Sequence, residues 1–335
     1  MSGVIRRSVW SNLDFEYELA GGPAFRPSPQ LKKLCGRWEA ILRLLPGCEE
    51  ATIGPEAGAE IVPWGVSPSI VQATGEQRFP EIETVRELND KRFSHRLEEE
   101  LGCALPGAHI VGSLSELERA TRRSEGDWVL KHPLGVGGRE RVTGKGGQAN
   151  PQARSWAASR FAEGWSLVFE PWAYRRTESS FHFEIEESGT AFLGQCGLVS
   201  DESGAFRGNT VKRVSELDTE LLDTVQLAMA RVWETGYRGP VSVDSFRGFL
   251  GETPVLRPLM EINARYSFGR MALELFRRIP EGWSLFWWHP KARELRAVEE
   301  QAREFPEHWA PGVYRLPRFA DPRQVTGSFL VVEQL

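Results

Sequence analysis

Cysteine and histidine are sparse in this chain and never occur at the spacing of a disulfide or metal motif. The 335 residues include four cysteines without CxxC spacing and six histidines without an HxxxH pair. Such dispersed residues indicate neither a disulfide-stabilised scaffold nor a zinc site. Any metal ion that the chain binds should therefore be a hard cation with oxygen ligands.

Long apolar runs and clusters of basic residues are also missing. No stretch approaches about 18 consecutive apolar residues, so we expect no membrane span. The segment from Met1 to Trp10 contains two arginines without a following apolar run, and we expect no secretory signal there. With a net charge of −5 and no basic stripe, the chain is not expected to bind nucleic acid. We therefore expect a cytoplasmic protein.

Two common nucleotide-binding signatures are missing as well. The N-terminal segment contains no GxGxxG, so the dinucleotide fingerprint is absent from it. The glycine-rich segment after Lys131 does not match GxxxxGK[ST], which rules out a P-loop.

What is present is an ordinary globular composition on a chain long enough for several lobes. Hydrophobic residues make up 41% and charged residues 26%, as in typical folded proteins. The length allows two or three lobes. We predict four parts: a small N-terminal α/β domain at 1–85, one lobe with a glycine-rich segment at 86–165, a second lobe at 166–285, and a C-terminal extension at 286–335 that packs on the body.

Apolar periodicity and capping residues predict the local elements. In the N-terminal part, apolar residues at helical spacing indicate a helix near Gln30–Leu45, and short apolar runs indicate two strands. Farther on, Ser113 opens a capping box, and Asn150 before a proline marks another helix start. The expected elements are strands near 51–53, 60–62, 128–131, 166–170, 180–187, 191–199, 241–246, 255–263 and 329–332, and helices near 90–101, 113–123, 151–163, 216–235 and 269–276.

Two neighbouring strands carry oxygen-bearing side chains. Because side chains alternate along a strand, Glu261 and Asn263 share one face, whereas Met260 and Ile262 point toward the core. If the two strands pair as a hairpin, Asp244 joins them on the same face. Two carboxylates and a neutral oxygen suit Mg²⁺. Phosphate oxygens and water molecules then complete its octahedral coordination. The alternative is a polar, solvent-facing side of an edge hairpin.

Basic side chains next to these strands suit an anionic partner. Arg265, two residues after Asn263, is placed to meet charge on a transferred phosphoryl group or to form a salt bridge with Glu261. Lys131 ends an apolar strand before a glycine-rich loop, which suits phosphate contact or a plain surface loop. For Lys91, near a helix start, the sequence leaves two interpretations: a second contact to phosphate, or an ordinary solvent-exposed lysine.

Glu170 and Trp172 follow the end of another apolar strand. An extended segment beside a proline can offer backbone N–H and C=O groups to an adenine edge, and Glu178 could accept from ribose hydroxyls. Plain loops have the same composition. Trp64, Trp172, Trp287 and Trp288 suit either an aromatic substrate pocket or a packed core.

The order of these features along residues 86–275 resembles the ATP-grasp superfamily. Its most specific part is the ExNxR pattern of Glu261, Asn263 and Arg265 after Asp244, followed by the VLKHP strand with its glycines. The resemblance implies an ATP-grasp fold of two α+β lobes gripping ATP, preceded by the small N-terminal domain.

The resemblance also implies roles for individual residues. Arg265 would be catalytic, and the segment from Gly135 to Gly147 would be a mobile lid over the phosphates. Nucleotide contacts would come from Lys91, Lys131, Gly135, Gly137, Gly138, Glu170, Trp172, Glu178 and Lys212, and Mg²⁺ (or Mn²⁺) would be bound by Asp244, Glu261 and Asn263.

These implications lead to one expected activity and two alternatives. We expect an ATP- and Mg²⁺-dependent ligase that activates a small-molecule carboxylate as an acyl-phosphate for attack by an amine or a thiol. An ATP-grasp kinase for a small molecule is the first alternative, and a nucleotide-binding protein without turnover is the second. The oligomeric state stays open between a monomer and the homodimer that many proteins of this fold form.

Overall fold

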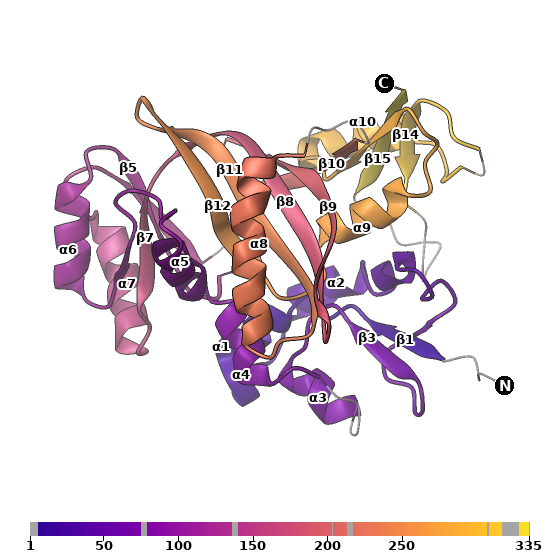
Figure 1. Ribbon diagram of the computed structural model, residues 1–335, viewed down its shortest axis with the longest axis horizontal. Helices are drawn as coiled ribbons and strands as arrows, with labels where there is room; N and C mark the ends of the chain where they lie inside the picture. The colour runs from indigo at the N-terminus through magenta and orange to yellow at the C-terminus, as the bar shows by residue number, and fades with distance from the viewer. Residues whose placement is uncertain are drawn as a thin grey trace.

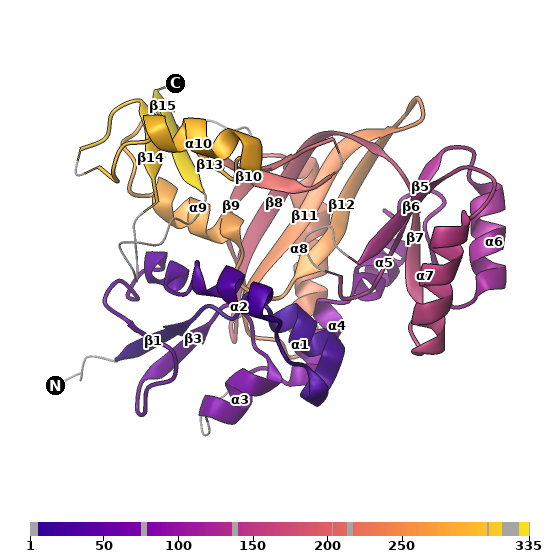
Figure 2. The ribbon, with the colours of Figure 1, turned by 180° about the vertical axis from the view of Figure 1, so that it is seen from behind.

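The computed structural model describes residues 6–74, 79–135, 140–202, 204–212, 217–306, 308–316 and 328–334. Within these ranges the strands form a three-stranded, a four-stranded and an eight-stranded sheet. The eight-stranded sheet lies in the middle of the molecule (Figure 1). The lobe with the four-stranded sheet lies beside it, and the N-terminal unit lies below its other side (Figure 2).

The N-terminal unit is a small α/β layer with parallel strands. Strand β1 is central, and β2 and β3 both pair with it in parallel, as expected of an α/β unit. Its elements are β1 (Arg7–Trp10), α1 (Phe15–Gly21), η1 (Gly22–Ala24), α2 (Pro29–Gly36), η2 (Ile41–Leu44), β2 (Thr52–Ile53), β3 (Glu60–Pro63) and α3 (Pro68–Thr74).

The single helix predicted over Gln30–Leu45 is wrong. Helix α2 ends at Gly36, a residue with low helix propensity, and a separate 3₁₀ helix follows at η2. Trp38, Ile41, Leu42 and Leu45 of the pattern are buried nevertheless, whereas Leu31 is partly buried. The periodicity therefore identified these buried positions but not the break in the backbone.

The four-stranded antiparallel sheet is covered by helices on one face. Trp128 of β5 and Phe169 of β7 pack in one cluster with residues of α6 and α7. Side chains alternate along a strand, so Lys131 and Glu170 extend from the opposite face. The elements of this lobe are α4 (Ile82–Leu88), α5 (Lys91–Glu100), β4 (His109–Val111), α6 (Leu114–Arg123), β5 (Asp127–Lys131), β6 (Arg141–Lys145), α7 (Pro151–Ala162) and β7 (Leu167–Pro171).

Two helix starts confirm the capping predictions, and a third helix is capped in the same way. The side chain of Asp90 accepts a hydrogen bond from the Arg92 N–H at the start of α5. Ser113 accepts from a backbone N–H at the start of α6, and Asn150 does the same at α7. These caps satisfy N–H groups that have no partner inside the helix.

The glycine-rich segment is partly a strand rather than a loop. Residues 141–145 form β6, which pairs with β5 from Lys131↔Arg141 to Asp127↔Lys145. Gly144 lies against the Trp128 ring, where a Cβ atom would collide with it. Gly137 and Gly138 lie outside the described residues, so the predicted lid stays a prediction for that part of the segment.

The eight-stranded antiparallel sheet has the order β12-β11-β8-β9-β10-β13-β15-β14. Helix α8 packs on β8, β9 and β12, and α9 packs on β8, β9, β10 and β13. Figure 1 shows α8 lying along the front of this sheet. The elements are β8 (Tyr174–Glu186), β9 (Gly189–Ser200), β10 (Phe206–Lys212), α8 (Thr219–Glu234), β11 (Gly239–Leu250), β12 (Thr253–Asn263), α9 (Phe268–Phe276), β13 (Trp283–Trp288), α10 (Ala292–Gln301), β14 (Gly312–Arg315) and β15 (Phe329–Gln334).

The C-terminal segment extends this sheet. The apolar run at 329–332 forms β15, which pairs with β13, so the prediction of a strand there is confirmed. Strand β13 spans the predicted boundary at 285/286, and β7 lies past the boundary at 165/166 although it belongs to the four-stranded sheet. The chain thus changes sheets after Pro171 and not at residue 165. The predicted division into four parts stays a prediction.

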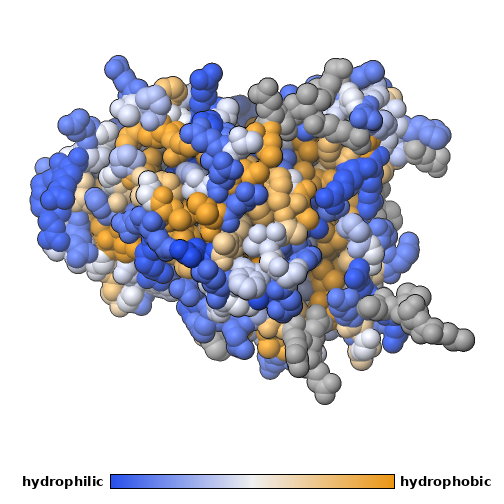
Figure 3. Space-filling model, viewed as in Figure 1, coloured by the Kyte–Doolittle hydropathy of each residue, from blue (hydrophilic) through white to orange (hydrophobic). Residues whose placement is uncertain are grey.

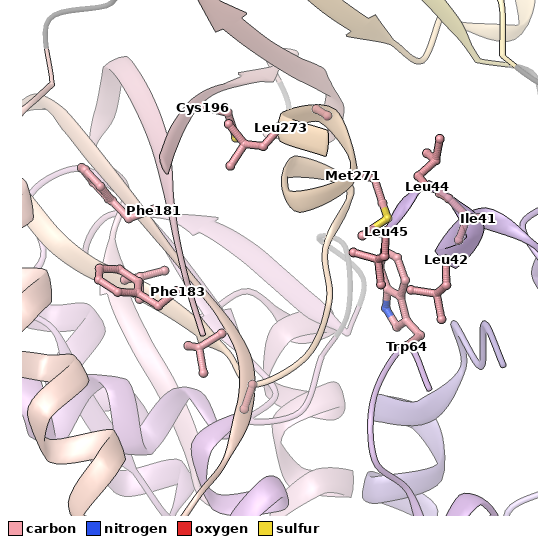
Figure 4. Close-up of a cluster of buried hydrophobic side chains, with 14 of the residues drawn as sticks. Ile41, Leu42, Leu44, Leu45, Trp64, Phe181, Phe183, Cys196, Met271 and Leu273 are labelled. Carbon is pink, nitrogen blue, oxygen red and sulfur yellow. The ribbon is translucent and has the colours of Figure 1, made fainter. Parts of the chain in front are cut away.

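One continuous hydrophobic core joins the N-terminal unit to the large sheet. It contains Trp64 and Leu42 from the N-terminal unit together with Met271 of α9 and Phe181 of β8. Figure 4 shows Trp64 beside Leu42 and Leu45, with Met271 nearby. The N-terminal unit is therefore fixed against α9, next to one end of the large sheet.

Charged residues cover the outer surface of the four-stranded lobe. Figure 3 shows hydrophilic residues over its far end, where α6 lies in Figure 1. Among the described residues, we find no helix with the length and apolar character that crossing a membrane requires.

Candidate active site

A cavity of about 130 Å³ lies where the four-stranded lobe meets the large sheet. Lys91 and Lys131 line it from α5 and β5, and Asp244 and Glu261 line it from β11 and β12. We call it the first cavity. Two basic and two acidic side chains therefore face one space from opposite lobes.

Asp244 and Glu261 form a direct cross-strand pair. In the antiparallel β11–β12 hairpin, Asp244 is opposite Glu261 and Ser242 is opposite Asn263. Val241 and Val243, which alternate with them, are buried in the core on the other side. The structure thus brings Asp244, Glu261 and Asn263 together on one face, as the alternation predicts, with Asn263 next to the pair rather than across from it.

Met260 departs from the predicted alternation, because it lines the first cavity beside Glu261 while it also packs, partly buried, against the small cluster that contains Phe246. The register of the hairpin shifts between Asp244 and Phe246, a bulge that leaves unequal numbers of residues on the two strands. Such a bulge re-aims nearby side chains, which a strict period of two cannot anticipate.

The paired carboxylates have opposite pKa shifts. Burial, and then the nearby Glu261 carboxylate, raise the pKa of Asp244 to about 7. Burial acts in the same direction on Glu261, but Lys91, together with Lys131 and Arg265, outweighs it and lowers the pKa of Glu261. The pair therefore holds one firmly ionised carboxylate beside one that is readily protonated, and a bound cation would favour the ionised form of both.

Lys91 links the two lobes at this point. Its Nζ lies 2.9 Å from Oε1 of Glu261 and donates to the Gly135 carbonyl oxygen at 2.5 Å. Its backbone N–H also donates to the carbonyl oxygen of Pro133 at 3.0 Å. The start of α5 is thereby held between the β11–β12 hairpin and the segment that follows β5.

Lys131 belongs to a buried ion-pair cluster. Its Nζ is 2.5 Å from Oε2 of Glu170, whose Oε1 accepts from Nη2 of Arg257 at 2.9 Å. Arg257 also binds Glu98, at 2.6 Å through Nε and at 3.0 Å through Nη2. Burial lowers the pKa of Lys131, so its ammonium group loses a proton more readily than that of an exposed lysine.

Glu170 of the segment expected to face adenine belongs to this cluster. Burial disfavours the Glu170 carboxylate, yet Arg257 and Lys131 together lower its pKa, so it is ionised and fully engaged. The Trp172 N–H donates to the Asp127 carbonyl oxygen at 2.8 Å and is therefore not free for an adenine edge. Neither residue lines the first cavity.

Glu178 lines the first cavity, whereas Lys212 does not. Glu178 is paired with Arg175 at 2.7 Å. Lys212 is the last residue of β10 and lines a neighbouring cavity that also contains Arg175 and Glu178. The structure therefore places Glu178 beside Lys91 and Lys131 but does not bring Lys212 into the same cavity.

A second cavity, of about 390 Å³, lies between the N-terminal unit and the large sheet. It shares Asp244 and Glu261 with the first cavity and is also lined by Asn263 and Arg265. The Arg265 guanidinium donates to Glu16 of α1 at 2.8 Å through Nε and to Oδ1 of Asn263 at 2.8 Å through Nη2. The two carboxylates thus stand at the junction between the two cavities.

Arg141 adds positive charge to the first cavity, as its place in the glycine-rich segment suggests for an anionic partner. Three other lining residues had no signal in the sequence: Arg175 of the first cavity, and Glu16 and Phe206 of the second. They lie on elements that pattern reasoning did not connect to the site. Of the four tryptophans considered, Trp64 lines the second cavity.

The donor set fits a hard divalent cation. Two carboxylates and an amide oxygen share one face, and burial together with the Glu261 carboxylate raises the pKa of Asp244, an effect that a bound cation would offset. Within the described residues, no three His, Cys, Asp or Glu side chains gather in a metal-binding group. A cation here would thus depend on two carboxylates, an amide and non-protein oxygens, which is typical of Mg²⁺ bound with a phosphate ligand.

Comparison with known proteins shows the fold. No family model and no curated protein matches the sequence. Among solved structures, N5-carboxyaminoimidazole ribonucleotide synthetase from Thermus thermophilus is 15% identical, with a TM-score of 0.55 over 98% of this chain and 93% of that chain. The synthetase from Staphylococcus aureus, complexed with ADP, is 9% identical, with a TM-score of 0.57 over 99% and 93%. This chain has the ATP-grasp fold.

A second kind of ATP-grasp enzyme gives the same result. The biotin carboxylase domain of the Hydrogenobacter thermophilus 2-oxoglutarate carboxylase is 12% identical, with a TM-score of 0.58 over 99% of this chain and 81% of that chain. The ATP-grasp fold predicted from residues 86–275 is therefore confirmed, and the likeness to these structures covers nearly the whole chain. The four-stranded lobe and the large sheet are its two lobes, with the first cavity between them.

Proposed function

We propose that this protein is an ADP-forming ligase that activates a carboxylate with ATP and Mg²⁺ and joins it to an amine or a thiol. The observation that carries the proposal is the Asp244–Glu261 pair, which stands where a cavity with two lysines meets a cavity with one arginine. A phosphoryl group can be transferred across such a junction from one bound substrate to the other.

The nucleotide would bind in the first cavity. Lys91, Lys131, Arg141 and Arg175 line it and supply the positive charge that a triphosphate requires. Lys91 and Lys131 are each paired with a glutamate in this structure, so phosphate oxygens would compete with those carboxylates. The Staphylococcus aureus structure contains ADP, and the Hydrogenobacter thermophilus structure contains MgADP, which agrees with this assignment.

Asp244, Glu261 and Asn263 would hold Mg²⁺, with Mn²⁺ as a possible substitute. When bound, the ion supplies charge neutralisation and orientation of the phosphate oxygens for in-line transfer. The protein's own part is positional, because the hairpin fixes both carboxylates on one face. Lys91 keeps Glu261 ionised and ready to bind a cation.

The acid substrate would bind in the second cavity with its carboxylate near Arg265. Its carboxylate oxygen would attack the γ-phosphorus, the bond to the bridging oxygen would break, and ADP would leave. The amine or thiol would then attack the acyl carbon, and inorganic phosphate would leave with the electron pair of the acyl C–O bond. Arg265, held by Glu16 and Asn263, is placed to stabilise the oxyanion of this second step.

The test is ADP release with Mg·ATP, a panel of carboxylic acids, and hydroxylamine as a general amine. We expect ADP to form only when acid, hydroxylamine and Mg²⁺ are all present, and a hydroxamate to form in equal amount. ADP with a stable phosphorylated alcohol and no need for an amine would instead identify a kinase. No ADP with any acceptor would contradict both activities.

A further inference from the structure

The second cavity has an apolar wall built from both sides of its boundary. Trp38 and Trp64 come from the N-terminal unit, Phe206 from β10 and Phe268 from α9. The Phe268 ring lies 5.1 Å from that of Trp38, 5.4 Å from that of Trp64 and 6.2 Å from that of Phe206, measured between centroids. Such rings bury large flat ligands well and hydrate poorly when left open.

The charges in this cavity are concentrated at one end. Among its described lining residues, Arg265 is the basic side chain, and the acidic ones are Glu16, Asp244 and Glu261. A guanidinium has five N–H donors, and three bonds are made, to Glu16, Asn263 and the Tyr266 carbonyl oxygen. The remaining donors can bind one carboxylate, and the described lining offers no second basic side chain to a phosphate dianion or a second carboxylate.

Two buried polar atoms in the wall have no partner among the described residues. They are Oδ1 of Asn209 and Oγ of Ser242, and both residues are 1% exposed and line the cavity. The amide nitrogen of Asn209 is already used by Cys196 at 3.3 Å, so its oxygen is the atom that still needs a donor. Buried polar atoms are normally hydrogen-bonded, and a donor group on a ligand would satisfy them.

We propose that the second cavity selects a monocarboxylic acid with an aromatic or similarly bulky apolar body and a hydrogen-bond donor on that body. The carboxylate lies at Arg265, the ring lies among Phe268 and its neighbours, and the donor pairs with Asn209. Small acids are poor ligands, because they leave the aromatic side chains exposed to water. Dicarboxylates and phosphorylated sugars are poor ligands, because they bring a second negative charge that has no basic partner among the described residues that line the cavity. This assignment of substrate class rests on the proposed ligase function.

The first experiment measures binding by calorimetry in the presence of Mg·ADP. The probes are phenylacetate, 4-hydroxyphenylacetate, acetate, bicarbonate, succinate and ribose 5-phosphate. We expect both aromatic acids to bind roughly tenfold or more tightly than acetate, with the hydroxylated one tighter, because ring burial and a satisfied buried acceptor both favour them. Equal or tighter binding of bicarbonate, succinate or ribose 5-phosphate would overturn the proposal.

A charge placed in the apolar wall gives a matched pair of variants. Leu31 lines the cavity from α2, whereas its neighbour Gln30 is exposed and does not. Leu31→Glu should weaken binding of phenylacetate about tenfold or more, and Gln30→Glu should leave it within about twofold, while both retain Mg·ADP affinity. Equal effects of the two variants on phenylacetate would contradict the proposed position of the ring.

Binding and turnover separate the two proposals. ADP release that is fastest with bicarbonate or succinate, without preference for aromatic acids, would keep the ligase and reject this substrate class. Tight binding of aromatic acids without hydroxamate formation would keep the substrate class and reject the ligase. Neither binding nor ADP release with the whole panel would reject both.

Discussion

The carboxylate of Glu16 accepts a hydrogen bond at 2.8 Å from Nε of Arg265, although 249 positions separate the two residues in the chain. Glu16 lies in the first turn of α1, and Arg265 follows the end of β12. Arg265 also lies over the Phe15 ring, with 5.9 Å between its guanidinium carbon and the ring centroid. The N-terminal unit therefore orients the arginine that the ExNxR pattern supplies.

Loss of this contact should impair use of the acid substrate and spare the nucleotide. In Glu16→Gln the neutral amide holds the guanidinium less firmly, since hydrogen bonds to charged groups contribute about 1.5–3 kcal/mol. We expect kcat/KM for the acid to fall roughly tenfold or more, with Mg·ADP affinity unchanged by calorimetry. Glu39→Gln, exposed on the same unit, is the control. An equal loss in the control, or a loss of nucleotide affinity, would contradict the positioning role.

The metal site gives the second prediction. Glu261→Gln removes a charge from the proposed Mg²⁺ ligands and from the Lys91 ion pair. We expect Mg·ATP turnover to fall by roughly a hundredfold or more, with an unchanged circular dichroism spectrum. Glu252→Gln, exposed at the turn of the same hairpin, should keep wild-type activity. Turnover near the wild-type rate in Glu261→Gln would remove this residue from the metal site.

The sequence predicted the convergence of side chains from strands close in the chain. The alternation along 241–246 and 255–263 was sufficient for Asp244 and Glu261, because one hairpin joins the two strands. Its failure at Met260 has a local cause, the register shift, which depends on the pairing and not on the pattern of either strand.

The rest of the site depends on contacts between distant parts of the chain. The buried cluster of Glu98, Glu170 and Arg257 joins three elements whose charged residues look like ordinary surface residues in the sequence. No period in a strand or helix distinguishes a buried ion pair from an exposed one. The second cavity could not be predicted from sequence patterns either, because Trp38 and Phe268 become neighbours only when the N-terminal unit packs on α9.

The raised pKa of Asp244 predicts a pH-dependent stability of the metal-free protein. The folded protein binds a proton on Asp244 up to about pH 7, whereas an unfolded aspartate releases it near its model value of 3.8. The free energy of unfolding contributed by this group therefore falls as pH rises between these two values. We expect Asp244→Asn, measured in EDTA, to have a Tm relative to wild type that increases from pH 5 to pH 8.

Mg²⁺ and ADP should oppose this effect in the wild-type protein. The cation binds to ionised Asp244. At pH 8 this carboxyl is already ionised, whereas at pH 6 it must first lose a proton, so the cation binds more tightly at pH 8. We expect the increase in Tm on adding Mg·ADP to be larger at pH 8 in wild type and nearly independent of pH in Asp244→Asn. A Tm difference between the two proteins that stays constant from pH 5 to pH 8 would show that Asp244 does not titrate in this range.

The ion-pair cluster around Arg257 predicts a large loss of stability from one substitution. Arg257 is 2% exposed and bridges Glu98 and Glu170, so Arg257→Met leaves two buried carboxylates without their main cation. Removing one partner of a buried pair typically costs about 3–5 kcal/mol, because the remaining charge is uncompensated. Urea unfolding should show a loss of this size.

An exposed arginine in the same sheet is the matched control. Arg247 pairs with Asp218 at 2.6 Å, but its side chain is 39% exposed. Solvent screening limits such pairs to about 0–1 kcal/mol, so Arg247→Met should change the free energy of unfolding by no more than about this amount. Similar losses in the two variants would mean that the Arg257 cluster is hydrated in solution. In that case Glu170 and Lys131 would be more accessible to a nucleotide than the buried geometry indicates.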